Sequence, residues 1–410
     1  MGDTHNDYDY LSIRLPVTSS PFPGTDSVTI PADHTEKGRA MPVRPASSQG
    51  SLPEEREDDD GIPRAQEADL ERLSLILFGH SAFQCLNAAC ELGLFELLAS
   101  SGPLTAQEVG DSLGLADRAT DILLLGCTAL GLTRKNADQY RVAPVITWLM
   151  EQGEWQHLRN TVAFEQHIVY PGQVDFTEAL RRNTNAGLRR IPGEGADLYR
   201  RIAAQPRLEQ VFYRYMRSWS QLANGHLVET LDLSATHRLL DCGGGEAVNA
   251  IALARANPEL RVTVLDLPSA ATLARKRIEE ADLAERISVV AADMFTAPFP
   301  EGHDCVLFAH QLVIWTPEEN TALLRKAHAA LPPGGRVVVF NSMSHDSGEG
   351  PLVAALDSVY FASLPAEGGM IYPWRLHEEC LRAAGFAEVR RHACPGWTPH
   401  GILVASKPPA

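Results

Sequence analysis

Three consecutive glycines, at positions 243 to 245, separate a predicted strand from a predicted helix in RLLDCGGGEAVNAIALA (238–254). Glycine costs folding entropy, so a run of it here indicates that the backbone must come close to something. In open α/β sheets ligands bind outside the carboxyl ends of the strands. Asp241 and Glu246 flank the glycines, and no lysine or arginine stands in the turn to hold a phosphate. The turn therefore favours a ligand without phosphates and admits one that carries positive charge.

Two further strand ends carry side chains that suit an adenosyl ligand. Asp266 stands 21 residues after Gly245, at the end of the second predicted strand, where a carboxylate can accept from both hydroxyls of a ribose. Asp293 and Met294 end a later strand, where an acid can accept from an adenine amino group and a methionine can cover the ring. A triple glycine alone is also compatible with a plain tight turn. The three features together predict S-adenosyl-L-methionine, a sulfonium joined to adenosine.

The residues from 238 onward must position these side chains, and they alternate between strand-like and helix-like segments. This alternation predicts an α/β fold with a Rossmann-like, doubly wound and mainly parallel sheet. The predicted strands cover 237–242, 261–267, 287–293, 304–313, 334–342, 387–393 and 401–407, and the predicted helices include 247–257, 268–281 and 319–331.

The residues before 231 have a different texture. Residues 1–66 are rich in proline and acidic residues, which predicts a disordered extension. Residues 67–98 are apolar on almost all sides of a helix, so we expect helices that are buried on several sides. A capping box, a second helix and a predicted hairpin follow within 104–144, which is a winged-helix order. That order fits either a DNA-binding or a dimerisation module. The second helix is rich in leucine and nearly lacks basic residues, which favours dimerisation.

Composition narrows the partners and the compartment. The net charge of −16 argues against nucleic-acid and anionic-membrane partners, which attract basic surfaces. The apolar runs are too short to span a bilayer, and the N-terminus lacks the apolar core of a secretory signal. Seven scattered cysteines without a CxxC pair predict reduced thiols and no zinc or other metal site. We therefore expect a cytoplasmic protein.

Five motifs resemble those of the S-adenosylmethionine-dependent O-methyltransferase family of caffeate, hydroxyindole and polyketide type. They are LLDCGGGEA, VLDLPSA, AADMF, ALPPGGRVVV and RAAGF, and the similarity covers roughly residues 70–407. The resemblance implies a class I methyltransferase domain, preceded by a mainly helical winged-helix domain that forms an intertwined homodimer. The cofactor residues that motif and resemblance together predict are Asp241, Gly243, Gly244, Gly245, Asp266, Leu267, Asp293 and Met294.

This chain departs from the family at the general-base residues. In plant members of the family a histidine takes the acceptor's proton. The position of that histidine is occupied here by Val313, and valine cannot accept a proton. The family's cofactor-contacting lysine falls on Ala309, and its two histidine-orienting glutamates fall on Asn341 and Ile371. The departures are similar to a bacterial branch that methylates ring carbons of tyrosine-like or kynurenine-like amino acids. The nearest replacement bases are His310 and His167, although each also fits a hydrogen-bonded structural histidine. An aromatic acceptor pocket could be lined by Tyr213, Tyr215, Trp219, Trp315, Met343 and Trp374, but at any single position core packing is favoured.

These observations predict a methyltransferase for a small phenolic or aromatic metabolite in natural-product biosynthesis. Either a phenolic oxygen or the neighbouring ring carbon is compatible as the methylated atom. One alternative is a relative that binds the cofactor for other chemistry, and another is a winged-helix DNA-binding regulator. The predicted organisation is an extension (1–66), a dimerisation domain (67–230) and a cofactor-binding methyltransferase domain (231–410).

Overall fold

The computed structural model describes residues 64–409. The predicted extension therefore lies outside the described residues, except for its last three positions. Those three belong to the first helix, α1 (Arg64–Leu77), so helical structure begins slightly earlier than the sequence predicts.

The N-terminal elements follow the predicted order of helices and a hairpin. Thr105 and Glu108 form the predicted capping box, in which each side chain bonds the other residue's backbone amide. The hairpin strands pair antiparallel, and a short strand adds to the second of them. The elements are α2 (Gly79–Leu92), α3 (Leu94–Ser101), β1 (Leu104–Thr105), α4 (Ala106–Leu113), α5 (Asp117–Ala129), β2 (Thr133–Asn136), β3 (Gln139–Val142) and α6 (Pro144–Glu151).

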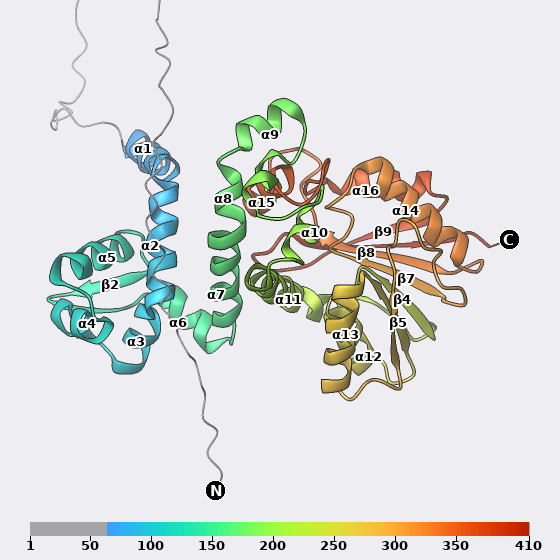
Figure 1. Ribbon diagram of the computed structural model, residues 1–410, viewed down its shortest axis with the longest axis horizontal. Helices are drawn as coiled ribbons and strands as arrows, with labels where there is room; N and C mark the ends of the chain where they lie inside the picture. The colour runs from blue at the N-terminus through green and yellow to red at the C-terminus, as the bar shows by residue number, and fades with distance from the viewer. Residues whose placement is uncertain (1–63, 410) are drawn as a thin grey trace, which may run out of the picture. The chain divides into compact units, whose positions relative to one another are not determined.

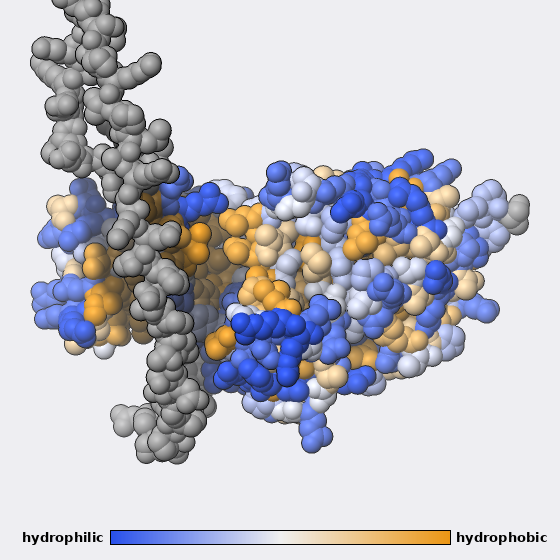
Figure 2. Space-filling view, turned by 90° about the horizontal axis from the view of Figure 1, so that it is seen from above, coloured by the Kyte–Doolittle hydropathy of each residue, from blue (hydrophilic) through white to orange (hydrophobic). Residues whose placement is uncertain are grey.

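The expected burial of the first helix is wrong for the single chain. All residues from Ala68 to Phe78 are exposed, and Ile76 and Leu77 keep 71% and 67% of their surface. Figure 2 shows hydrophobic side chains exposed in the half of the molecule that holds the N-terminal helices. Its apolar side chains are concentrated in the second half of the helix, at Leu73, Leu75, Ile76 and Leu77, and no element among residues 64–409 buries them.

Short helices connect this part to the sheet. The predicted loop at 184–195 contains a short 3₁₀ helix, and a π-helical turn interrupts the first long helical segment. The elements are α7 (Trp155–Phe164), η1 (Glu165–Val169), α8 (Tyr170–Gln173), α9 (Phe176–Arg182), η2 (Ala186–Arg190), α10 (Leu198–Ile202) and α11 (Pro206–Thr230).

The C-terminal part forms the predicted doubly wound sheet. Its strand order is β6-β5-β4-β7-β8-β10-β9. Only β10 pairs antiparallel with its two neighbours, β8 and β9, and the other pairs are parallel. The strands are β4 (Arg238–Cys242), β5 (Arg261–Asp266), β6 (Ile287–Ala291), β7 (Cys305–Ala309), β8 (Arg336–Ser342), β9 (Ala387–Ala393) and β10 (His400–Ser406). The chain order reverses beside β4, which is where such folds place their ligands.

Helices cover both faces of this sheet (Figure 1). Buried side chains of α11, α12 (Val248–Ala256) and α13 (Pro268–Glu280) pack on one face. Those of α14 (Pro317–Ala330) and α16 (Trp374–Ala383) pack on the other. The remaining helix, α15 (Leu352–Ser363), packs on α8 and α9.

The fourth predicted strand ends earlier than expected. β7 stops at Ala309, and His310 has a φ of +59°, which no strand residue adopts. The apolar residues Leu312 and Val313 continue the hydrophobic pattern but are buried in the turn that follows. This early turn brings His310 to the carboxyl edge of the sheet. Among the described residues no single helix combines the length and apolar character needed to cross a membrane, and only the bent pair Ala68–Leu77 and Gly79–Leu92 passes when taken together.

Candidate active site

The glycine turn between β4 and α12 is shaped by close approaches of other side chains. A Cβ on Gly243 would overlap the amide of Gln311, whose Nε2 donates to the Gly243 carbonyl at 2.9 Å. A Cβ on Gly244 would lie 2.6 Å from a carboxylate oxygen of Asp241 beneath it. Around Gly245 nothing lies within 4 Å of such a Cβ, so its outer side is open. Gly243 and Gly244 thus lie too close to neighbouring side chains for a Cβ, whereas Gly245 leaves space for a ligand.

Asp266 ties the second strand to this turn. Its two carboxylate oxygens accept hydrogen bonds from the backbone amides of Gly245 at 2.7 Å and Leu267 at 2.6 Å. Burial raises the pKa of Asp266, and these two hydrogen bonds partly oppose that rise. The carboxylate is held rigidly at the edge of the sheet.

A third segment at this edge follows β6 and carries Asp293 and Met294. Lys326 of α14 donates to the carbonyls of Met294, Phe295 and Ala297. The backbone amide of Phe295 bonds the Asp293 carboxylate at 2.8 Å. The lysine therefore fixes the backbone that presents these two side chains.

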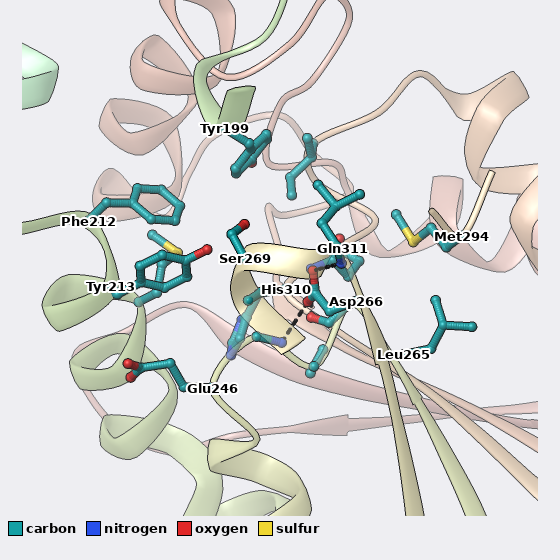
Figure 3. A pocket seen from close by; sticks show the side chains of 18 of the residues that line it. Tyr199, Phe212, Tyr213, Glu246, Leu265, Asp266, Ser269, Met294, His310 and Gln311 are labelled. Carbon is teal, nitrogen blue, oxygen red and sulfur yellow. Dashed lines mark hydrogen bonds between the residues drawn. The ribbon is translucent and has the colours of Figure 1, made fainter. Parts of the chain in front are cut away.

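These segments open on one cavity of about 420 Å³ (Figure 3). In Figure 3 Tyr199, Phe212 and Tyr213 lie across the cavity from Asp266, Gln311 and Met294. The cavity lining thus combines a polar edge of the sheet with an aromatic wall from the preceding helices. Of the predicted site residues it includes Gly243, Gly244, Gly245, Asp266, Leu267, Asp293, Met294, His310, Tyr213, Trp219 and Trp315.

His310 lies in the cavity wall in an unusual environment. Its Nε2 is buried and has no hydrogen-bond partner among the described residues. Burial lowers the pKa of His310 to about 4, so the imidazole is neutral at neutral pH. Its ring centre lies 5.1 Å from that of His400, both of whose ring nitrogens are also buried without partners in the described chain. Unpaired buried groups in a strained turn are typical of functional sites.

The structure places several predicted residues outside the cavity lining. Asp241 is fully buried beneath Gly244 and therefore supports the turn from behind. His167 lies in η1, where the charges of Glu91 and Arg207 act on it. Three of the six pocket candidates pack into protein cores, the alternative that the sequence favoured at any single position. Tyr215 stacks on Phe164, and Met343 and Trp374 pack against Gly401.

The positions that carry the base constellation in plant relatives offer no substitute for it. Val313 and Ile371 are buried in an apolar cluster. Asn341 is fully buried, with neither side-chain polar atom bonded to a described residue. Ala309 lines the cavity without a functional group. His310, three residues before Val313, lines the cavity and can accept a proton.

Sequence reasoning missed several residues of the cavity. Gln311 holds the glycine turn, and its place directly after a strand end was the available signal. Arg217 of α11 forms two hydrogen bonds with the buried Glu246, at 2.7 and 3.1 Å, and both line the cavity. Tyr199 and Phe212 complete the aromatic wall. These come from helices whose packing on the sheet no local pattern reveals.

Two family models match this chain. One is described as an O-methyltransferase domain and matches residues 174–387. The other is described as an O-methyltransferase dimerisation domain and matches residues 74–152. Together they cover both the helical part and the sheet.

Individual relatives agree with these matches. The L-tyrosine C(3)-methyltransferase of Streptomyces lavendulae is 60% identical over 341 residues, which are 83% of this chain and 93% of that protein. The 3-hydroxy-5-methyl-1-naphthoate 3-O-methyltransferase of Streptomyces sahachiroi is 36% identical over 79% of this chain and 91% of that protein. The crystal structure of the S-adenosylmethionine-dependent methyltransferase SibL in its apo form has a TM-score of 0.74 and 55% identity, covering 83% of this chain and 99% of that one.

Proposed function

This chain belongs to the O-methyltransferase family and is an S-adenosylmethionine-dependent methyltransferase, and from that premise we propose that it methylates ring carbon 3 of tyrosine or of a close phenolic amino acid. The observation that carries the proposal is the 60% identity with a tyrosine C(3)-methyltransferase along nearly its whole length. A relative that methylates an oxygen is far less similar, at 36% identity. The carbon is therefore favoured over the oxygen as the methylated atom.

The cavity suits the cofactor. The open side of Gly245 admits a ligand against the backbone, and the fixed carboxylate of Asp266 suits a ribose diol. Asp293 and Met294 would hold the adenine, while Asp241 would act through the turn it supports. When bound, S-adenosylmethionine supplies a methyl group on a sulfonium, which an aligned nucleophile can take directly.

The aromatic wall would hold the acceptor ring. Phe212, Tyr213, Trp219 and Trp315 line the same cavity as His310. Aromatic side chains of this kind stack well on a phenol ring at modest entropic cost. The wall orients the ring, and orientation is the main requirement for an in-line displacement.

His310 is the residue we propose as the base. It is neutral at neutral pH and can accept the phenolic proton, which makes the neighbouring ring carbon nucleophilic. A phenol has a pKa near 10, so transfer to a group of pKa about 4 is uphill by roughly 8 kcal/mol. The proton therefore leaves as the carbon–carbon bond forms rather than before it. As the carbon–carbon bond forms, the bond from the methyl group to the sulfonium sulfur would break, and S-adenosylhomocysteine would leave. The methylated ring carbon would then lose its hydrogen as a proton, and the oxygen would regain the proton held by His310. Overall the methyl group replaces a ring hydrogen, and one proton is released.

The test is a turnover assay that follows S-adenosylhomocysteine release with tyrosine as the acceptor. We expect turnover that depends on both tyrosine and S-adenosylmethionine. If S-adenosylhomocysteine binds but a panel of phenolic amino acids gives no turnover, the chain uses its cofactor for other chemistry. Salt-dependent binding to DNA would favour the regulator alternative instead.

The helical part would form a homodimer. The match to a dimerisation domain and the exposed apolar side chains of α1 and α5, such as Ile76 and Leu125 at 71% each, support this. Burial of these residues against a second copy removes a large apolar surface from water. In this proposal the helix pair and hairpin are a winged-helix module that serves dimerisation, and the domain boundary falls at 230/231, after α11. Monomers at micromolar concentration in light scattering would contradict the dimer.

We further propose that the enzyme acts in the cytoplasm, without nucleic-acid or membrane partners. All seven cysteines are free, which suits a reducing compartment. The strongly negative net charge disfavours both polyanionic partners.

A further inference from the structure

Two carboxylates outside the cavity lining have no evident structural role. Glu165 opens the π-helical turn η1, and Asp357 lies in the middle of α15. Both side chains are only partly buried. Within the described chain neither forms a hydrogen bond or an ion pair. Carboxylates in such positions are normally paired.

Two tyrosines beside them are unpaired as well. Tyr215 and Tyr360 keep 5% and 4% of their surface, yet neither hydroxyl bonds any group among residues 64–409. Both rings contact Phe164, the residue before Glu165, with ring centres 3.9 Å and 5.3 Å from it. A buried tyrosine usually finds a partner for its hydroxyl. Neither hydroxyl oxygen is among the fully buried polar atoms without a partner, so each is open to a polar group beside it.

The two acids border the same pair of tyrosine rings. Glu165 directly follows Phe164, whose ring contacts both tyrosines, and Asp357 stands three residues before Tyr360, on the same side of α15. Burial raises the pKa of Glu165 to about 7, and the charge of Asp357 adds to that rise. Burial likewise raises the pKa of Asp357 to about 7. Burial raises the pKa of Tyr215 and of Tyr360, and the charges of Asp357 and Glu165 add to both rises. A positively charged group at this place would relieve the cost of ionising the two acids.

This cluster adjoins the aromatic wall of the cavity. The ring of Tyr215 lies 5.9 Å from that of Trp219, which lines the cavity. Phe164, Tyr215, Trp219 and Tyr360 belong to one packed apolar cluster that also contains Ile314 of the cavity wall. The π-helical turn at Glu165 is a feature that often marks functional sites. A ligand whose ring rests on the wall could therefore extend toward the carboxylates.

We infer that Glu165 and Asp357, with the hydroxyls of Tyr215 and Tyr360, form a subsite that binds the ammonium group of an amino-acid acceptor. The inference rests on the proposed function and adds that the enzyme recognises the ammonium group of the acceptor. An ammonium group offers three N–H donors, which suit carboxylate and hydroxyl oxygens. Among the described residues no group of histidine, cysteine, aspartate or glutamate side chains is suited to hold a metal ion, so an organic cation fits better. The subsite would select amino acids over phenolic acids.

The test compares three phenols by calorimetry on the full chain loaded with S-adenosylhomocysteine. They are tyrosine, tyramine, and 3-(4-hydroxyphenyl)propanoate, which lacks the amine. We expect the native protein to bind both amines at least about tenfold more tightly than the propanoate. Asp357→Asn and Glu165→Gln should each weaken tyrosine binding by about 10- to 100-fold, the effect of losing a charged hydrogen bond. Binding of the propanoate should be unchanged or tighter.

Matched controls separate recognition from folding. Glu279→Gln removes an exposed carboxylate on α13 and should leave all three affinities unchanged. Equal affinity of the native protein for the amines and the propanoate would overturn the inference without any variant. An equal loss of tyrosine and propanoate binding in both variants would also overturn it. Selective amine binding without methyl transfer would support the subsite and overturn the proposed function. Methylation of tyrosine and the propanoate with equal KM would support the proposed function and overturn the subsite.

Discussion

The carboxylate of Asp266, at the end of β5, accepts a hydrogen bond from the backbone amide of Gly245 at 2.7 Å. This bond joins the second strand of the sheet to the glycine turn after the first. The residue that would hold a ribose therefore also orients the turn against which the ligand rests. Cofactor binding and the geometry of the turn depend on the same side chain.

Asp266→Ala should weaken S-adenosylhomocysteine binding by at least about 2 kcal/mol, or roughly 30-fold, because charged hydrogen bonds are lost. Isothermal calorimetry measures this directly. Glu279→Gln serves as the control and should bind like the native protein. Equal affinity of Asp266→Ala and the native protein would remove Asp266 from the cofactor site.

Gly243→Ala should destabilise the protein by about 1–3 kcal/mol, since Gly243 has a φ of +71° and a Cβ would overlap Gln311. Gly225 in α11 is the matched control. No atom lies within 4 Å of a Cβ at that position, so Gly225→Ala should be neutral or stabilise the helix by up to about 1 kcal/mol. Denaturant unfolding of both variants checks the contrast, and similar effects would show that the turn tolerates a side chain.

His310→Ala should lower turnover by roughly 10²–10⁴, the usual contribution of a positioned base, with little change in cofactor affinity. Higher pH should partly restore the variant, because the phenol then ionises in solution. His167→Ala should keep nearly native turnover, since His167 does not line the cavity. Parallel loss of cofactor binding in His310→Ala, or a larger loss of turnover in His167→Ala, would contradict the assignment of His310.

Asp241→Asn should change how stability depends on pH. Burial, with a smaller effect of the Asp266 charge, raises the pKa of Asp241 to about 7. Because the folded-state pKa lies above the unfolded value, the favourable contribution of the protonated acid is complete below about pH 4 and is lost as the pH rises toward 7. Relative to Asp241→Asn, the native protein should therefore lose up to about 4 kcal/mol of unfolding free energy between pH 4 and pH 8. Parallel curves for the two proteins would show that Asp241 ionises normally.

The sequence predicted the parts of this site that depend on local patterns. Gly243, Asp266 and Asp293 each follow an apolar run, a local pattern that marks the end of a strand. All three residues line one cavity. His310 was placed correctly at a carboxyl edge, although its strand ends earlier than the apolar pattern suggests. That pattern continues through Val313 because the turn itself is buried.

Features that depend on distant packing could not be predicted. The sequence suggested Met343 and Trp374 as candidates for the acceptor pocket, but both side chains pack around Gly401. That packing depends on the pairing of β8 with β10, which no local pattern shows. Glu165 and Asp357 lie far apart in the sequence and meet only because α15 packs back onto the short helices after α7. Neither residue stands in a motif, so no local signal marks them.

The central claim is methyl transfer to a ring carbon of tyrosine, and NMR of the product tests it most directly. The enzyme is incubated with tyrosine and S-adenosylmethionine that carries ¹³C in its methyl group. The account predicts a labelled methyl attached to the ring carbon beside the phenol oxygen, together with loss of that carbon's proton signal. A labelled methyl on the phenolic oxygen or on the amino nitrogen, with every ring proton retained, would contradict it.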